Sequence, residues 1–231
     1  KYNHSWIEEP PDEWQMEWDS ELLDRLGPQE NLLSRGFRFA NGSRFLYIQM
    51  ELCKCSLANW LSDANNGQRN ENRMKTWFKQ IVSAVAYIHE HGKIHRDLKP
   101  SNILLTAYDR LKICDLGIIA DLALAEDQEE VPLSRTFDRG TIMYRAPEQI
   151  GWVGYTSRVD IFPLGLILTE LLVDMTVQKT AEIFKNYREK VPETILNHVP
   201  QAKALVSWMI KEDATKRPSC EEILKSEFFL S

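Results

Sequence analysis

One short region limits what this chain can fold into more than any other. Two apolar runs, residues 103–105 and 111–113, are joined by a polar turn at residues 106–110. This pattern predicts two short strands. Residues 94–102 (IHRDLKPSN) precede the first run, and residues 115–117 (DLG) follow the second. Charged or amide side chains therefore stand at both outer ends of one strand pair.

The side chains at these ends suit transfer of a phosphoryl group. Asp97 can accept a hydroxyl proton, or orient the substrate hydroxyl, and Lys99 can neutralise charge that builds on a γ-phosphate. Asn102 and Asp115 carry the hard oxygen atoms that Mg²⁺ prefers. We therefore expect these four residues to surround one nucleotide tail, with Asp97 and Lys99 as the catalytic pair.

Three ordered motifs resemble those of eukaryotic protein kinases. The catalytic loop H-R-D-L-x-x-x-N corresponds to residues 95–102, the metal motif D-F-G to residues 115–117, and A-P-E to residues 146–148. Leu116 replaces the usual Phe but stays apolar. The resemblance implies an α+β, protein-kinase-like fold with a mainly helical large lobe and the last strands of a small β lobe. It also implies that ATP and Mg²⁺ are cofactors.

The resemblance implies two domains. Residues 1–53 would be a remnant of the small lobe with an acidic insert and the hinge, and residues 54–231 would be the large lobe. Asn41-Gly42 lies between alternating apolar runs at residues 36–40 and 44–52, a pattern that predicts two strands joined as a hairpin. Met50 would then be the gatekeeper beside ATP. The backbone groups of Glu51, Leu52 and Cys53 would contact adenine, although an ordinary edge strand would show the same pattern.

Hydrophobic periodicity predicts most of the large lobe to be helical. Residues 74–89 have one apolar face, and residues 158–173 are apolar on nearly every side, which predicts a buried central helix. No strand is expected after Ile113. The remaining expected elements are a strand at 1–9 and helices at 20–26, 57–61, 181–188, 202–210 and 220–225.

The kinase resemblance also implies structural roles. Glu148 is expected to pair with Arg217 in a buried ion pair, and Asp160 to brace the backbone of the catalytic loop from the central helix. His95 is expected to pack in the core. Thr141, read together with Lys99, resembles the serine/threonine branch of the family.

A regulatory site is expected between the metal motif and the A-P-E motif. Thr136 lies in the basic part of that stretch, and a phosphate there could recruit Arg96 and order the loop. An unmodified loop threonine is the alternative interpretation.

Several stretches resemble the kinases that phosphorylate the α-subunit of translation initiation factor 2. The similarity is greatest to the endoplasmic-reticulum-stress kinase (PERK-like) and the haem-regulated kinase. It implies that this α-subunit is the substrate, in stress-induced control of translation. Residues 180–188, with Thr180 in particular, match the helix on which that family docks its substrate, although a plain surface helix is the alternative. The stretches are residues 2–9, 47–53, 96–103, 146–150 and 160–168.

Some family features are absent from the 231 residues. No glycine-rich loop precedes the hinge strand, no V-A-x-K lysine is present, and no following helix supplies the glutamate partner of that lysine. We therefore expect these residues to be the carboxy-terminal part of a kinase and to be inactive alone, with a homodimer formed through the missing small lobe. The alternative is a kinase-like scaffold that binds a partner near Thr180 without catalysis.

Net charge and cysteine content limit the binding partners and the cellular compartment that the sequence predicts. The net charge of −6 argues against nucleic-acid or membrane-surface binding, and no apolar run reaches membrane-spanning length. Cys53-Lys54-Cys55 lacks a second pair at zinc spacing, so reduced thiols are expected. We expect a cytoplasmic protein, or a region that faces the cytosol from a membrane-anchored parent.

Overall fold

A computed structural model describes residues 2–8, 45–63, 69–115, 120–121, 143–151, 156–175, 180, 182–184 and 196–230. The chain divides into two compact units, Lys1–Leu52 and Cys53–Ser231. Each unit is considered by itself below. Within the described residues, no helix has both the length and the apolar character needed to cross a membrane.

The described residues of the first unit form an antiparallel strand pair. Strand β1 (Tyr2–Glu8) pairs with β2 (Phe45–Met50), with Trp6 opposite Tyr47 and an irregularity between Tyr2 and His4. The strands predicted at 1–9 and within 44–52 are thus confirmed. The predicted turn at Asn41-Gly42 and the predicted helix at 20–26 lie outside the described residues.

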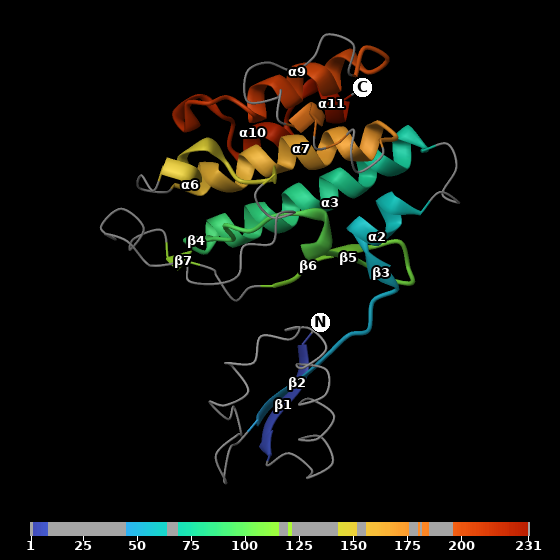
Figure 1. Cartoon of the computed structure of the whole chain (residues 1–231), viewed down its shortest axis with the longest axis vertical. Coiled ribbons are helices and arrows are strands. Elements are labelled where there is room, and N and C mark those ends of the chain that lie inside the picture. Colours follow the sequence, from blue (N-terminus) through green and yellow to red (C-terminus); the bar gives the residue numbers. More distant parts are fainter. Residues whose placement is uncertain are drawn as a thin grey trace, which may run out of the picture. The chain divides into compact units, whose positions relative to one another are not determined.

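The second unit is organised around two long helices (Figure 1). Helix α3 (Glu71–Glu90) begins at Asn70, whose side chain accepts a hydrogen bond from the backbone N–H of Arg73. This cap explains why α3 starts three residues before the predicted helix. Helix α7 (Ile161–Leu172) is buried along almost its whole length, as predicted for the central helix. It packs between α3 and α9 (Pro200–Met209).

The remaining helices are short and surround this pair. The expected helices at 57–61, 202–210 and 220–225 are confirmed as α2, α9 and α10. Residues 182–184 are helical within the range predicted at 181–188, and residue 180, just before that range, is helical too. The short elements are α2 (Leu57–Ser62), α6 (Pro147–Gly151), α10 (Cys220–Leu224), α11 (Glu227–Leu230) and the 3₁₀ turns η3 (Pro100–Asn102), η5 (Ser157–Asp160) and η6 (Ala214–Lys216).

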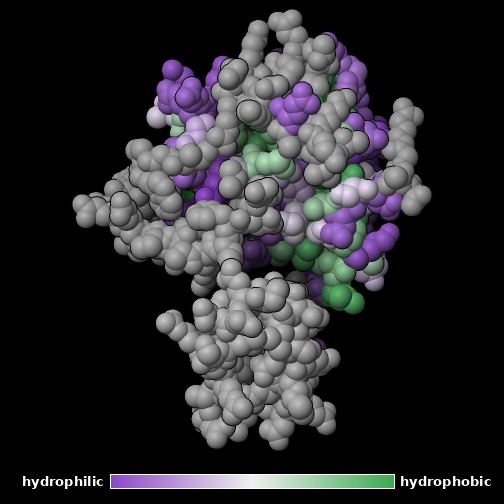
Figure 2. Space-filling model, in the orientation of Figure 1, coloured by the Kyte–Doolittle hydropathy of each residue, from purple (hydrophilic) through white to green (hydrophobic). Residues whose placement is uncertain are grey.

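Close packing of α7 against α9 depends on a glycine. A Cβ atom at Gly165 would lie 2.6 Å from Cγ2 of Ile210 and 3.2 Å from Cβ of Met209. No side chain larger than hydrogen fits at this position without displacing a neighbour. The buried apolar residues of α3, α7 and α9 form one continuous core. Figure 2 shows hydrophilic side chains over much of the described part of the visible face.

Where the structure describes it, the second unit also contains two small sheets. Strands β3 (Cys55–Ser56), β5 (Ile103–Leu105) and β6 (Leu111–Ile113) form an antiparallel sheet in the order β3-β5-β6. The predicted strand pair is therefore β5 and β6. Strand β4 (Lys93–Ile94) pairs with β7 (Ala120–Asp121). The expectation that no strand follows Ile113 is wrong, since β7 follows it. This strand has only two residues and is too short to show a periodic pattern in the sequence.

Candidate active site

The strand pair brings the two expected metal ligands to the same end of the sheet. Ile103 lies opposite Ile113, and the backbone N–H of Cys114 donates a 2.9 Å hydrogen bond to the carbonyl oxygen of Asn102. Asn102 precedes β5 and Asp115 follows Cys114. The polar turn at residues 106–110 lies at the opposite end of the sheet.

Asp97, Lys99 and Asn102 form a connected cluster beside this end. Oδ2 of Asp97 lies 3.0 Å from Nζ of Lys99, and Nδ2 of Asn102 donates to the same oxygen at 3.1 Å. Nδ2 of Asn102 also donates to the Asp97 carbonyl at 2.9 Å. Only 14% of the Asp97 side chain and 18% of the Lys99 side chain are exposed, so water screens their attraction weakly.

The donor atoms of this cluster fit Mg²⁺. In the described part of the chain, no group of three or more His, Cys, Asp or Glu side chains could hold a metal ion. Mg²⁺ needs fewer protein ligands, because phosphate oxygens and water complete its shell. Nδ2 of Asn102 is occupied by Asp97, which leaves Oδ1 as the atom that could bind metal. The carboxylate of Asp115 is exposed at the same end.

Asp160 holds the backbone just before Asp97. Its carboxylate is fully buried and accepts hydrogen bonds of 2.8 Å from the backbone N–H groups of both His95 and Arg96. Arg96 has a φ of 67°. This left-handed conformation costs roughly 1–2 kcal/mol for a residue other than glycine, so neighbouring contacts must hold it in place.

His95 joins the catalytic loop to the end of β6. Its fully buried ring contacts the Cys114 carbonyl through Nε2 at 3.0 Å, and Nδ1 lies 3.3 Å from the backbone N–H of Asp97. One neutral form of the ring satisfies both contacts, with the proton on Nε2 and Nδ1 as acceptor. The expectation that His95 packs in the core agrees with this position.

Glu148 and Arg217 form the ion pair that the sequence led us to expect. Arg217 donates to the two carboxylate oxygens of Glu148 at 2.6 and 2.8 Å. Arg217 is 2% exposed, and its remaining hydrogen bonds go to the carbonyl groups of Lys211, Glu212 and Arg158. The pair connects α6 to the chain that precedes α10.

The sequence analysis did not identify His89 and Gln149, yet both residues contact the catalytic loop or the Asp160 side chain that holds it. Nε2 of His89 lies 2.8 Å from Oδ2 of Asp160. Nε2 of Gln149 donates a 2.9 Å hydrogen bond to the carbonyl oxygen of Arg96. His89 is part of a helical run and Gln149 follows the A-P-E motif, and neither position has a pattern that predicts a contact with the catalytic loop.

Tyr144 and Glu170 form a further, partly buried contact near α6. The Tyr144 hydroxyl donates a 2.7 Å hydrogen bond to Oε2 of Glu170 on α7. Burial raises the pKa of Glu170 to about 7, against the opposing effects of Tyr144 and Arg69. The Tyr144 ring also lies edge-on to Phe184, at 5.8 Å between ring centroids. This contact links the segment before α6 to residues 182–184.

Other expected site residues are not brought into the cluster. Met50, which is 65% exposed, and Glu51 belong to the first unit, while Cys53 belongs to the second, so the hinge assignment stays a prediction. Thr136 and Thr141 lie outside the described residues. Thr180 is only 5% exposed, which is unexpected for a residue that contacts a docked substrate directly.

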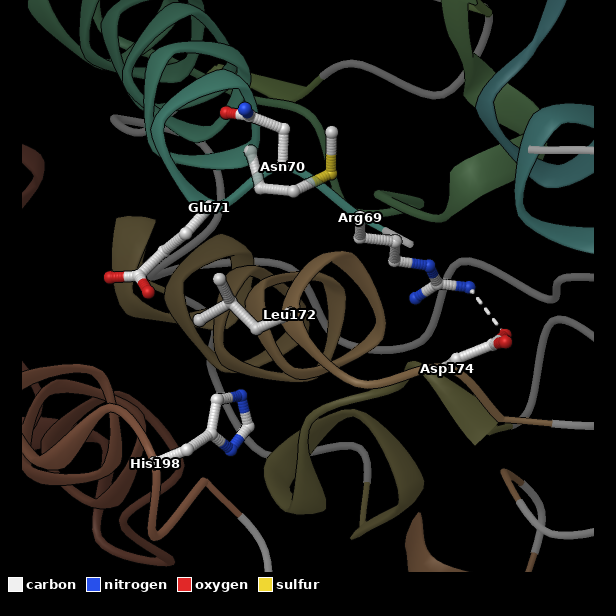
Figure 3. A pocket seen from close by; sticks show the side chains of 7 residues that line it. Arg69, Asn70, Glu71, Leu172, Asp174 and His198 are labelled. Carbon is white, nitrogen blue, oxygen red and sulfur yellow. Dashed lines mark hydrogen bonds and ion pairs between the residues drawn. The ribbon is translucent and has the colours of Figure 1, made fainter. Parts of the chain in front are cut away.

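A pocket of about 710 Å³ lies elsewhere in the second unit (Figure 3). It lies between the start of α3, the end of α7 and the turn before α9. It contains no residue of the catalytic loop. Its lining consists of Arg69, Asn70, Glu71, Met74, Leu172, Asp174 and His198.

Comparison with known proteins finds similarity to protein kinases. Residues 15–229 match the family model described as "Protein kinase domain". The chain is 36% identical over 199 residues to "Eukaryotic translation initiation factor 2-alpha kinase 3" of Rattus norvegicus, covering 80% of this chain and 18% of that protein.

Two further relatives have similar coverage. The "Interferon-induced, double-stranded RNA-activated protein kinase" of Rattus norvegicus is 40% identical over 188 residues, covering 80% of this chain and 35% of the relative. The "eIF-2-alpha kinase GCN2" of Homo sapiens is 35% identical over 207 residues, covering 79% and 12%. The chain therefore spans about a third or less of the length of these relatives.

Proposed function

This chain belongs to the protein kinase domain family, and from that premise we propose that it acts as a serine/threonine kinase on the α-subunit of translation initiation factor 2. The observation that carries the proposal is the contact of Asp97 with both Lys99 and Asn102, at the sheet end where Asp115 follows β6. The substrate is inferred from the printed names of the relatives.

The geometry suggests a role for each residue. Oδ2 of Asp97 is engaged by Lys99 and Asn102, which leaves Oδ1 to accept the proton of the substrate hydroxyl. Lys99 neutralises charge on the phosphoryl oxygens. Asn102 and Asp115 would hold Mg²⁺, whose positive charge would offset the negative charge of the phosphate groups. Most of the rate gain in this proposal comes from positioning and electrostatics.

A kinase assay tests this proposal. The full-length natural protein is incubated with radiolabelled ATP, Mg²⁺ and purified α-subunit, alongside an Asp97→Asn variant that keeps the side-chain shape. We expect transfer by the natural protein, loss of transfer on chelation of Mg²⁺, and a decrease of about 10²–10⁴ in rate for Asp97→Asn.

Each alternative outcome has a distinct meaning. Absence of transfer to any hydroxyl substrate would reject the kinase proposal and favour a binding scaffold. Transfer to a serine or threonine peptide but not to the α-subunit would reject only the substrate. Full activity of Asp97→Asn would reject the role of Asp97.

We also propose that the helix at residues 180 and 182–184 takes part in substrate docking. Thr180 is buried, so its effect would pass through the position of the helix as well as through contact. Thr180→Val, which keeps the branched shape, should spare phosphorylation of a short peptide and impair that of the folded α-subunit. Equal loss on both substrates would reject a docking role.

Regulation by phosphorylation at Thr136 is a further part of the proposal. A phosphate there would carry about −1.5 to −2 charges and could bind Arg96. The active protein should contain phosphate at Thr136 by mass spectrometry, and Thr136→Ala should reduce activity. Active protein without phosphate at this site would contradict the idea.

Since translation factors act in the cytosol, we propose that the site faces that compartment.

A further inference from the structure

The peptide group between Arg96 and Asp97 is held at both of its edges. Its carbonyl oxygen, on Arg96, accepts a 2.9 Å hydrogen bond from Nε2 of Gln149. Its N–H, on Asp97, lies 3.3 Å from Nδ1 of His95. Because a peptide group is planar, these two contacts together restrict its rotation. This rotation would change the direction in which the Asp97 side chain leaves the backbone.

Arg96, at one end of this peptide group, has a backbone conformation that is unfavourable for a residue other than glycine. Arg96 has a φ of 67°, in the left-handed region that favours glycine. The N–H of Arg96 donates to Oδ1 of Asp160, and its carbonyl group accepts from Gln149. Asp160 and Gln149 therefore hold the peptide groups on either side of the strained residue. Such strain is retained where surrounding contacts fix the backbone, often at functional sites.

We propose that Gln149 is a positioning residue that fixes the Arg96–Asp97 peptide group and so orients Asp97 for phosphoryl transfer. This inference rests on the proposed kinase function. Gln149 lies in α6, directly after the A-P-E motif, and its side chain donates to the backbone carbonyl of Arg96 in the catalytic loop. A change in the position of this side chain would therefore alter the support of the peptide group next to Asp97.

The chemistry of an amide explains why glutamine suits this position. Oε1 of Gln149 accepts a 3.0 Å hydrogen bond from the backbone N–H of Ala146, which turns Nε2 toward Arg96. The side chain must therefore accept at one end and donate at the other. A glutamate could still accept from Ala146 but could not donate to Arg96. A leucine could do neither.

This difference separates positioning from simple capping of α6. If Gln149 served only to accept the Ala146 N–H, Gln149→Glu would be harmless, since a carboxylate near a helix start is favourable. If it orients Asp97, Gln149→Glu should be harmful, because two acceptor oxygens would face each other. Gln80→Glu is a matched control. Oε1 of Gln80 accepts from the backbone N–H of Leu111 at 2.9 Å, away from the catalytic loop.

The test compares Gln149→Glu, Gln149→Leu and Gln80→Glu in the full-length natural protein. Steady-state kinetics with the α-subunit give kcat and the KM for ATP, and hydrogen–deuterium exchange follows the amides of residues 95–98. We expect kcat to decrease about tenfold for both Gln149 variants, with KM for ATP changed less than about twofold. The amides of Arg96 and Asp97 should exchange faster in both, and Gln80→Glu should match the natural protein.

The outcomes decide the inference separately from the kinase proposal. Natural kcat and natural amide exchange in Gln149→Glu would overturn it, as would an effect confined to Gln149→Leu. If the natural protein transfers no phosphate, the proposed function fails. Amide exchange in residues 95–98 then decides by itself whether Gln149 holds the Arg96–Asp97 peptide group.

Discussion

Arg217 binds both carboxylate oxygens of Glu148 while being almost completely buried. Replacing Arg217 with Met would leave the Glu148 carboxylate without this partner and would remove the hydrogen bonds from Arg217 to three backbone carbonyl groups. Breaking a buried pair from one side typically costs about 3–5 kcal/mol, and we expect a loss in this range in urea unfolding.

An exposed ion pair provides the control for this prediction. Lys225 lies 2.6 Å from Glu221, with more than 70% of each side chain exposed. Lys225→Met should lower the free energy of unfolding by less than about 0.5 kcal/mol. A similar loss for both variants would show that the burial of Arg217 has no special energetic consequence.

Glu170 should make stability depend on pH. Its pKa is raised from 4.5 to about 7 by burial, so the folded protein binds this proton more tightly than the unfolded chain. The associated stabilisation is complete below pH 4.5 and is lost as the pH rises through about 7. With allowance for solvent screening, the free energy of unfolding should decrease by up to about 2 kcal/mol across this range.

The Glu170→Gln variant isolates this effect. Urea unfolding at pH 5, 6, 7 and 8 should show a shallower decrease in stability for the variant than for the natural protein. Tyr144→Phe should keep the pH dependence, because the hydrogen bond from Tyr144 opposes the rise in pKa. Identical pH profiles for Glu170→Gln and the natural protein would contradict the assignment.

Gly165→Ala tests the close approach of α7 and α9. The added methyl group would meet Ile210 at 2.6 Å, so the helices must separate or a side chain must shift. Overpacking of this kind costs about 1–3 kcal/mol, measured as a lower midpoint in urea.

Gly92 provides a comparison, because it has a φ of 66° but open space around it. Gly92→Ala should therefore cost only the backbone strain, about 1 kcal/mol.

Cys220 should resist alkylation in the folded protein. It is 4% exposed, and burial raises the pKa of its thiol to about 12, so almost no thiolate is present at neutral pH. Mass spectrometry after iodoacetamide treatment should find Cys220 modified only once the protein unfolds. Cys55, which is half-buried in β3, should react earlier. Equal rates for the two residues would contradict the prediction.

Local patterns were sufficient to predict the long elements. The apolar face of residues 74–89 predicted α3 because burial of one face recurs every 3.6 residues. The uniform apolarity of α7 predicted its central position for the same physical reason. The motif residues Asp97, Lys99 and Asn102 were found because their chemistry and spacing lie within one short stretch.

Contacts between distant segments could not be predicted in this way. Strand β7 has two residues, and its pairing with β4 depends on the tertiary fold rather than on its own pattern. His89 contacts Asp160, and Gln149 donates a hydrogen bond to the Arg96 backbone. Nothing in a single sequence marks a histidine or glutamine side chain as the partner of a particular distant group.

The left-handed backbone at Arg96 is held by side chains that the ribosome adds much later. Gln149 follows Arg96 by 53 residues, and Asp160 follows it by 64. A ribosome that has just completed the HRD stretch has therefore synthesised neither partner, and chains fold from the amino terminus as they emerge. Truncated or stalled translation products that end before Gln149 lack both anchors. The two hydrogen bonds that hold the backbone of Arg96 from these side chains can therefore form only in chains that extend past Asp160.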